Sequence, residues 1–107
     1  MIDIRRGATP TFEFETDFDL SEFSDLYITI KQGTGRFAVF IEKTLKKDCL
    51  VTDERHFSCR LSQEDSLSLD SSKKAELQLK GKTAFGDVIV GDIVAFDVKR
   101  VLMEGAV

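Results

Sequence analysis

The sequence has little of what functional sites are commonly built from. It has no tryptophan, one tyrosine, one histidine, one proline and only two cysteines among its 107 residues. Two cysteines exclude the disulfide-dense framework of small secreted domains. The longest apolar runs span four to five residues, and the first residues include the charged Asp3, Arg5 and Arg6. We therefore predict neither a membrane span nor a signal peptide, and we expect the protein to be made in the cytoplasm.

Composition and charge indicate a folded domain. Hydrophobic residues make up 42% and charged residues 32% of the chain, as in globular proteins and unlike disordered segments. The length suits one domain, which we place over residues 1–107. The net charge is −4, and residues 1–30 hold seven acidic side chains against two basic ones. This excess of negative charge disfavours nucleic-acid binding, which depends on basic residues that neutralise phosphates.

Alternating apolar and polar residues dominate the sequence. In residues 11–16, Phe12 and Phe14 fall on one face and Glu13 and Glu15 on the other, which is typical of a half-buried strand. Similar runs predict strands at residues 26–31, 37–41, 49–52, 57–61, 75–80, 88–90 and 93–101. The segments between them are too short for the crossover helices of a parallel sheet. We therefore predict an all-β fold, an antiparallel two-sheet β-sandwich of seven to nine short strands, in preference to a partly open barrel.

The first expected hairpin joins residues 26–31 to residues 37–41. The inward side chains of both strands share one core only if the residue numbers of each cross-strand pair add up to an odd value. This condition requires a loop with an even number of residues. A short even loop places Ile30 opposite either Phe37 or Val39.

The second expected hairpin turns at residues 53–55. A three-residue loop places Val51 opposite Phe57 and Cys49 opposite Cys59. The apolar neighbours of both cysteines indicate that they pack in the core. The same register makes a cross-strand disulfide geometrically possible, although a cytosolic protein would normally keep the two thiols reduced.

Two local patterns predict turns. Ser62, followed three positions later by Asp65, fits the start of a short helix, so we expect at most one helical turn, near residues 62–68. Gly81, together with Lys82, is expected to form a turn. Gly86 and Gly91 are also interpreted as turn glycines and not as a phosphate-binding loop, because no helix follows them.

No group of residues has the composition of a catalytic or metal site. His56 lies in an expected loop without a partner that would make it a catalytic base, so we interpret it as a solvated side chain. The acidic stretch at residues 13–25 contains Glu13, Glu15, Asp17, Asp19, Glu22 and Asp25. It lacks the glycine and the terminal glutamate of an EF-hand loop and fits a solvated strand face, although the pattern leaves cation binding open. We predict no catalytic residue, no metal and no cofactor.

The unusual feature is that two strands carry apolar residues on both faces. Phe40 and Ala38 lie on the face opposite the inward set of residues 37–41, and Ile93 and Ala95 do so in the last strand. A sandwich strand normally exposes one face to water, so these residues are covered either by a loop or by another protein. The predicted interface comprises Tyr27, Ala38, Phe40, Ile93 and Ala95.

Four segments taken together resemble a known family. They are IRRGATPTF (residues 4–12), ITIKQG (28–33), LSQEDSL (61–67) and RVLMEGAV (100–107). In this order and spacing they are similar to small proteins encoded in tail modules of phages and prophages of Gram-positive bacteria, and to the immunoglobulin-like N-terminal domain of phage baseplate upper proteins. The resemblance implies an immunoglobulin-like sandwich, a structural role in the tail or baseplate, and no catalytic residue.

We therefore predict a non-enzymatic assembly module that binds other tail or baseplate proteins or a second copy of itself. It would be made in the host cytoplasm and enter the virion on assembly. A carbohydrate-binding β-sandwich is the alternative prediction. That function requires exposed tryptophan or tyrosine platforms for sugar rings, and this chain has a single tyrosine.

Overall fold

The computed structural model describes residues 2–102. The strands of this part are β1 (Ile2–Arg5), β2 (Thr11–Glu15), β3 (Phe23–Gln32), β4 (Val39–Thr44), β5 (Cys49–Val51), β6 (His56–Arg60), β7 (Ala75–Thr83), β8 (Val88–Val90) and β9 (Val94–Lys99). The helical turns are the α-helices α1 (Leu45–Asp48) and α2 (Gln63–Leu67) and the 3₁₀ helices η1 (Leu20–Glu22) and η2 (Gly35–Phe37).

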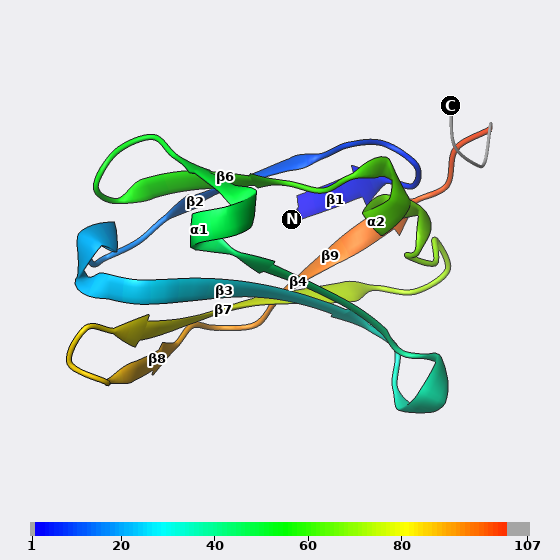
Figure 1. Cartoon of the computed structure of the whole chain (residues 1–107). Helices are drawn as coiled ribbons and strands as arrows, with labels where there is room; N and C mark the ends of the chain where they lie inside the picture. The colour runs from blue at the N-terminus through cyan, green and yellow to red at the C-terminus, as the bar shows by residue number, and fades with distance from the viewer. Residues whose placement is uncertain (1, 103–107) are drawn as a thin grey trace.

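The strands form a two-layer sandwich (Figure 1). The larger sheet has the order β1-β9-β7-β3-β4, with β8 also paired to β7, and the smaller sheet has the order β2-β6-β5. This arrangement confirms the predicted all-β, two-sheet architecture. The strand order corresponds to an immunoglobulin sandwich in which β9, β7, β3 and β4 stand for strands G, F, C and C′, and β2, β6 and β5 stand for B, E and D.

One strand pair departs from the antiparallel prediction. β1, which the sequence pattern does not predict, runs parallel to β9 and places Ile4 opposite Val98. The other strand pairs within residues 2–102 are antiparallel. Residues 2–5 alternate apolar with charged side chains, but the partner strand lies at the other end of the sequence, so the local pattern does not reveal this parallel pairing.

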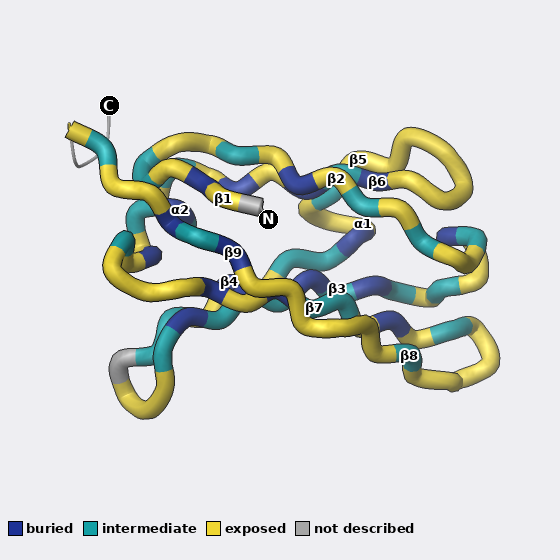
Figure 2. Tube along the Cα trace, turned by 180° about the vertical axis from the view of Figure 1, so that it is seen from behind, coloured by how far each residue is buried: buried dark blue, intermediate teal, exposed yellow. Residues whose placement is uncertain are grey.

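The core between the sheets follows the predicted alternation. In β3, Leu26, Ile28 and Ile30 are buried, while the residues between them are partly exposed. Phe57 of the smaller sheet and Phe96 of the larger sheet are fully buried in the same cluster. Buried positions, dark blue in Figure 2, occur in both layers, as expected for two sheets that share one core.

The β3–β4 hairpin has the predicted parity but different partners. Ile30 pairs with Ile41, which preserves the odd sum, and not with Phe37 or Val39. The prediction is wrong because η2 lies in the connection and lengthens the loop while keeping its number of residues even. Gly33 begins this loop with a φ of 81°, a conformation that glycine adopts without steric cost.

The β5–β6 hairpin confirms the predicted register. Cys49 pairs with Cys59, and Val51 pairs with Phe57. His56 is the first residue of β6, so it belongs to the strand and not to the loop.

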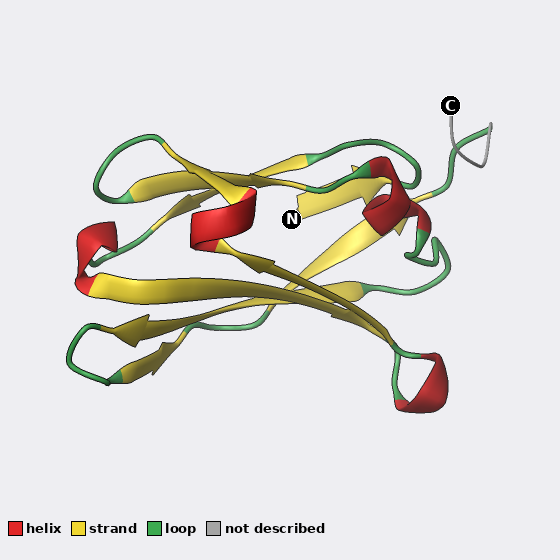
Figure 3. Ribbon diagram, in the orientation of Figure 1, coloured by secondary structure: helices red, strands yellow, loops and turns green. Residues whose placement is uncertain are grey.

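The helical turns are more numerous than predicted. α2 confirms the expected turn, because the Ser62 hydroxyl and the Asp65 carboxylate each accept a hydrogen bond from the other residue's backbone N–H. The limit of one helical turn is wrong, since α1, η1 and η2 are also present (red in Figure 3). α1 carries the chain from β4 to β5, and the Asp48 carboxylate accepts a hydrogen bond from the Thr44 N–H (2.9 Å). One turn is too short to leave a helical period in the sequence.

Gly81 and Lys82 lie inside β7, which corrects the prediction of a turn at these residues. A Cβ atom at position 81 would lie 2.7 Å from ring carbons of Phe23. The glycine is therefore required by the close packing of β3 against β7. The turn that follows β7 contains Gly86, which has a φ of 90°.

A buried glutamine fixes the segment between α2 and β7. Gln32 ends β3 and is 3% exposed. Its Nε2 donates hydrogen bonds to the carbonyl oxygens of Asp70 (2.7 Å) and Lys73 (2.9 Å), and its Oε1 accepts one from the Asp70 N–H (2.6 Å). One side chain thus satisfies three backbone groups of a connecting segment that has no sheet partner of its own.

The connection between β1 and β2 is held in the same way. Arg6 donates a hydrogen bond from Nε to the carbonyl of Leu69 (2.9 Å). The buried Ser66 hydroxyl donates to the carbonyl of Ala8 (2.6 Å) and accepts from the Gly7 N–H (3.0 Å). These contacts with α2 and the residues after it position the chain that enters β2.

Candidate functional site

The predicted interface residues lie on or beside the outer face of the larger sheet. Phe40 and Ile93 are 65% and 59% exposed, and Ala95 is also exposed. Tyr27 and Ala38 are partly buried. The outward position of Phe40 and Ala95 follows from the alternation along β4 and β9, and Ile93 directly precedes β9.

The structure does not bring these residues into one continuous patch. Ala95 lies opposite Glu76, Glu76 lies opposite Lys31, and Lys31 lies opposite Phe40. Three strand spacings of about 4.8 Å therefore separate Ala95 from Phe40, roughly 14 Å in all. The Lys31 ammonium lies 5.4 Å from the centre of the Phe40 ring, within the range of a cation–π contact. Charged side chains thus divide the predicted set into two parts.

An apolar strip runs along β8, through Ile93 of the connection, to the start of β9. We define the β8–β9 strip as the outward-facing residues Val88, Val90, Ile93 and Ala95, of which the first three are 55%, 55% and 59% exposed. β8 and β9 pair with the same edge of β7, and Ile93 directly precedes β9, so the four side chains follow one line. Val88 and Val90 are not in the predicted interface, although residues 88–90 are apolar on both faces and carry the same signal as the last strand.

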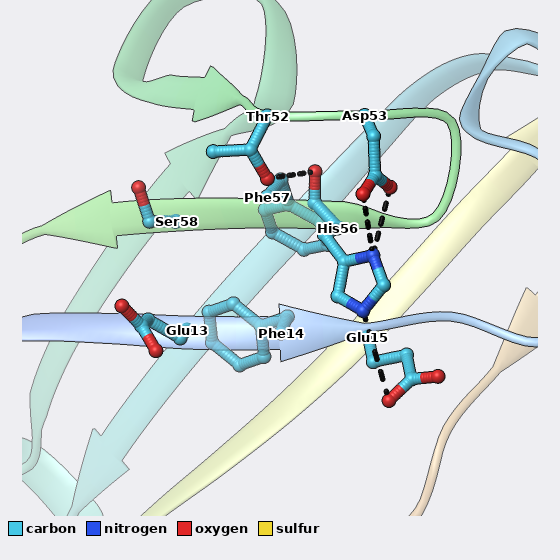
Figure 4. A pocket seen from close by; sticks show the side chains of 8 residues that line it. All are labelled: Glu13, Phe14, Glu15, Thr52, Asp53, His56, Phe57 and Ser58. Carbon is cyan, nitrogen blue, oxygen red and sulfur yellow. Dashed lines mark hydrogen bonds and ion pairs between the residues drawn. The ribbon is translucent and has the colours of Figure 1, made fainter.

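A second candidate is an open pocket of about 470 Å³ on the outer face of the smaller sheet (Figure 4). It is lined by Glu13, Phe14, Glu15, Thr52, Asp53, His56, Phe57 and Ser58. The β2–β6 register places Glu15 opposite His56, and the β5–β6 turn brings Asp53 to the other side of the imidazole. The Asp53 Oδ1 lies 2.7 Å from Nδ1, and the Glu15 Oε2 lies 3.8 Å from Nε2.

These two carboxylates favour the protonated form of the imidazole. The hydrogen bond with Asp53 raises the pKa of His56 above its ordinary value, and the charges of Asp53 and Glu15 act in the same direction. The Thr52 hydroxyl donates to the His56 carbonyl oxygen (3.1 Å) and is not directed at the ring. Within residues 2–102 the ring nitrogens contact carboxylates and no hydroxyl or thiol, so the arrangement can hold a proton but presents no nucleophile to a base.

His56 gives a direct test of this geometry. We expect an NMR titration of the single imidazole to yield a pKa above 6.5, and the Asp53→Asn variant to return the pKa toward that value. A raised pKa in the folded state means that the stabilising contribution is present at acidic pH and is lost as the pH rises through that pKa. A pKa at or below 6.5 in the unsubstituted protein would contradict the contacts with Asp53 and Glu15.

The two cysteines form a buried pair between β5 and β6. Cys59 is 2% exposed, and Cys49, its register partner, is partly buried. Burial raises the pKa of the Cys49 thiol to about 12, and the hydrogen bond with Cys59 adds to the effect. Burial also raises the pKa of the Cys59 thiol. Both groups are therefore held as thiols, which are far less reactive than thiolates.

The thiols should react slowly in the folded protein. We expect Ellman's reagent to label Cys49 and Cys59 at neutral pH much more slowly in buffer than in denaturant, because both burial and the raised pKa values disfavour the thiolate. The time course of absorbance measures the rate. Labelling of the native protein as fast as that of the denatured protein would show that the pair is not buried.

The acidic side chains of residues 13–25 do not converge on one point. The Asp19 carboxylate accepts a hydrogen bond from the Ser21 N–H (2.9 Å), which lowers the pKa of Asp19, and Asp25 accepts one from the Leu26 N–H (2.8 Å). In the part of the chain that the structure describes, no group of three or more His, Cys, Asp or Glu side chains is placed to hold a metal ion. No helix in this part is long and apolar enough to cross a membrane.

Comparisons with known proteins add a structural likeness. No protein-family model matches the chain, and no curated protein matches it. Among solved structures, the chain is similar to murine CRIg, with a TM-score of 0.46 and 8% sequence identity over 94% of this chain and 91% of that one.

Proposed function

We propose that this domain is a non-catalytic structural module that acts through protein–protein contacts in the tail or baseplate of a phage or prophage. The observation that supports the proposal most is the β8–β9 strip, a line of water-exposed valine, isoleucine and alanine side chains on one sheet face. Such a line is typical of a surface that another protein covers. The tail context rests on the sequence resemblance at residues 4–12, 28–33, 61–67 and 100–107.

The surroundings of the strip support the same function. Val88 and Val90 pair with Lys82 and Lys80 on β7, and Ala95 pairs with Glu76. Charged side chains therefore border the apolar line on the side of β7. An apolar centre with a polar rim is the usual composition of a protein interface.

Association with particles tests the proposal. Tail particles released by prophage induction in the strain that carries the gene would be purified on a density gradient, and the chain detected by immunoblot. We expect the unsubstituted chain to co-purify with the particles and the Val90→Lys/Ile93→Lys variant to be depleted by about tenfold or more, because lysines at the centre of an interface are poorly accommodated. The matched control is Thr29→Lys, which places a lysine on the same sheet face away from the strip.

Two outcomes would contradict the proposal. One is a chain that never co-purifies with particles, and the other is equal recovery of the strip variant and the control at equal melting temperature. Binding to a glycan array that survives in the Val90→Lys/Ile93→Lys variant would instead favour the carbohydrate-binding alternative.

A further inference from the structure

The smaller sheet ends at β2 with one unpaired edge. β2 pairs with β6, and no other strand within residues 2–102 pairs with it. The Leu61 N–H donates to the Pro10 carbonyl (2.9 Å), and the Thr16 N–H donates to the Arg55 carbonyl (2.8 Å). Because hydrogen-bonding direction alternates along a strand, the even-numbered residues of β2 face β6. The odd-numbered residues therefore point their backbone N–H and C=O groups away from the sheet.

A cleft of about 350 Å³ opens beside this edge, between the two sheets. Its apolar lining consists of Phe12, Phe14, Leu77, Val94 and Phe96. Val94 lies on the inner face of β9 and is still 43% exposed, because β1 pairs with β9 only from Phe96 onward. Figure 2 views this side of the molecule, where β1 lies between β2 and β9 at one end only.

The strand count explains why the cleft is open. The corresponding sheet of an immunoglobulin sandwich has four strands, with strand A beside strand B. Here that sheet has three strands in the part of the chain described, and β1 is paired with β9 in the other sheet. The free edge of β2 therefore offers unpaired backbone N–H and C=O groups, and apolar side chains line the cleft beside it. No strand of residues 2–102 occupies this position.

We infer that the free edge of β2 binds an extended segment of a partner protein as an added antiparallel strand, and that this segment alternates apolar residues with lysine or arginine. The inference rests on the proposed function and names the partner's chemistry. In such a pairing, the side chains opposite Phe12 and Phe14 enter the cleft, where they contact the exposed face of Val94. The side chains opposite Thr11, Glu13 and Glu15 lie on the outer face.

The negative charge on the outer face of β2 favours a basic partner segment over a second copy of this chain. Glu13 and Glu15 are exposed on the outer face of β2, and Asp53 lies in the same pocket as both. Basic side chains on the added strand would lie beside these carboxylates. Pairing of β2 with the β2 of a second copy would instead place glutamates opposite or diagonal to one another, and like charges across strands are destabilising.

A designed peptide tests the inference on the full chain. The probe is the heptapeptide TKVKIKT, titrated at low ionic strength into the ¹⁵N-labelled protein. We expect chemical-shift changes at the amides of Thr11, Glu13 and Glu15 together with their protection from hydrogen exchange. The same peptide with N-methylated lysines should not bind, because in antiparallel pairing the lysine backbone groups are those that face β2.

Charge reversal supplies the second arm of the experiment. The Glu13→Lys/Glu15→Lys variant should bind TKVKIKT about tenfold more weakly and should bind TEVEIET in its place. The control variant Glu42→Lys/Glu76→Lys carries the same charge change on the larger sheet and should bind TKVKIKT like the unsubstituted protein.

Four results would overturn the inference. They are unchanged β2 amides at saturating peptide, equal binding of the methylated peptide, insensitivity to the Glu13 and Glu15 reversal, and protection of the same amides by increasing protein concentration alone. The last of these would assign the edge to a second copy. The Val90→Lys/Ile93→Lys variant leaves β2 unchanged, so the peptide experiment and the particle experiment can fail independently.

Discussion

Replacement of Ile28 by lysine is expected to leave the domain unfolded. Ile28 is 1% exposed at the centre of β3 and belongs to the apolar cluster between the sheets. A lysine there would bury an ammonium group among apolar side chains. An unpaired buried charge costs several kcal/mol, against a total stability of roughly 5 to 15 kcal/mol for a domain. Thermal unfolding followed by circular dichroism should show no cooperative transition.

The neighbouring residue provides the control for this prediction. Thr29 lies on the opposite face of β3, between Gln78 of β7 and Glu42 of β4. Thr29→Lys places its ammonium in water near Glu42, so its melting temperature should stay within about 4 °C of the unsubstituted protein. A cooperative transition of the Ile28→Lys variant at the melting temperature of Thr29→Lys would contradict the burial of Ile28 between the sheets.

The second large effect is expected at Gln32. Gln32→Leu puts an apolar side chain of similar size at the buried position and removes the hydrogen bonds that Gln32 makes with the Asp70 N–H and with the Asp70 and Lys73 carbonyls. These three hydrogen bonds are part-buried, and a shielded group that loses its partner costs about 1–3 kcal/mol, so the expected loss is about 2–4 kcal/mol of unfolding free energy. The melting temperature should fall by roughly 10–25 °C.

Gln78→Leu is the matched control for Gln32→Leu. Gln78 lies on the outer side of β7 and makes one exposed hydrogen bond, from Nε2 to the Gly91 carbonyl (2.9 Å). Water can replace that bond, so the expected loss is below about 1 kcal/mol. Denaturant unfolding of both variants measures the difference. Equal losses of unfolding free energy in the two variants would contradict the stabilising role of the buried Gln32 side chain.

The local patterns of the sequence predict most of the strands because one face of each strand packs against the core, which makes apolar residues alternate with polar ones. The alternation in residues 26–31 identifies the core positions Leu26, Ile28 and Ile30, and a three-residue turn is enough to pair Cys49 with Cys59. In both cases the information lies within a few residues of the sequence. The same holds for the capping residues that begin α2.

Features that depend on distant contacts could not be predicted in this way. The alternation places Gln32 on the inner face of β3, but it does not reveal that Asp70 and Lys73 satisfy its amide. The position of β1 and the role of Gly81 likewise depend on partners far along the chain. Of the predicted interface, Ile93 and Ala95 lie in the β8–β9 strip, whereas charged residues of the same sheet separate Phe40 from them.

The most direct test of the proposed assembly function is site-specific photocrosslinking in assembled particles. The photoreactive residue p-benzoylphenylalanine would replace Val90 in one variant and Thr29 in a second, which carries the crosslinker on the same sheet face outside the strip. We expect illumination to crosslink the Val90 variant to another particle protein and to leave the Thr29 variant without a crosslink. Equal crosslinking from both positions, or none from Val90 in particles that contain the chain, would contradict it.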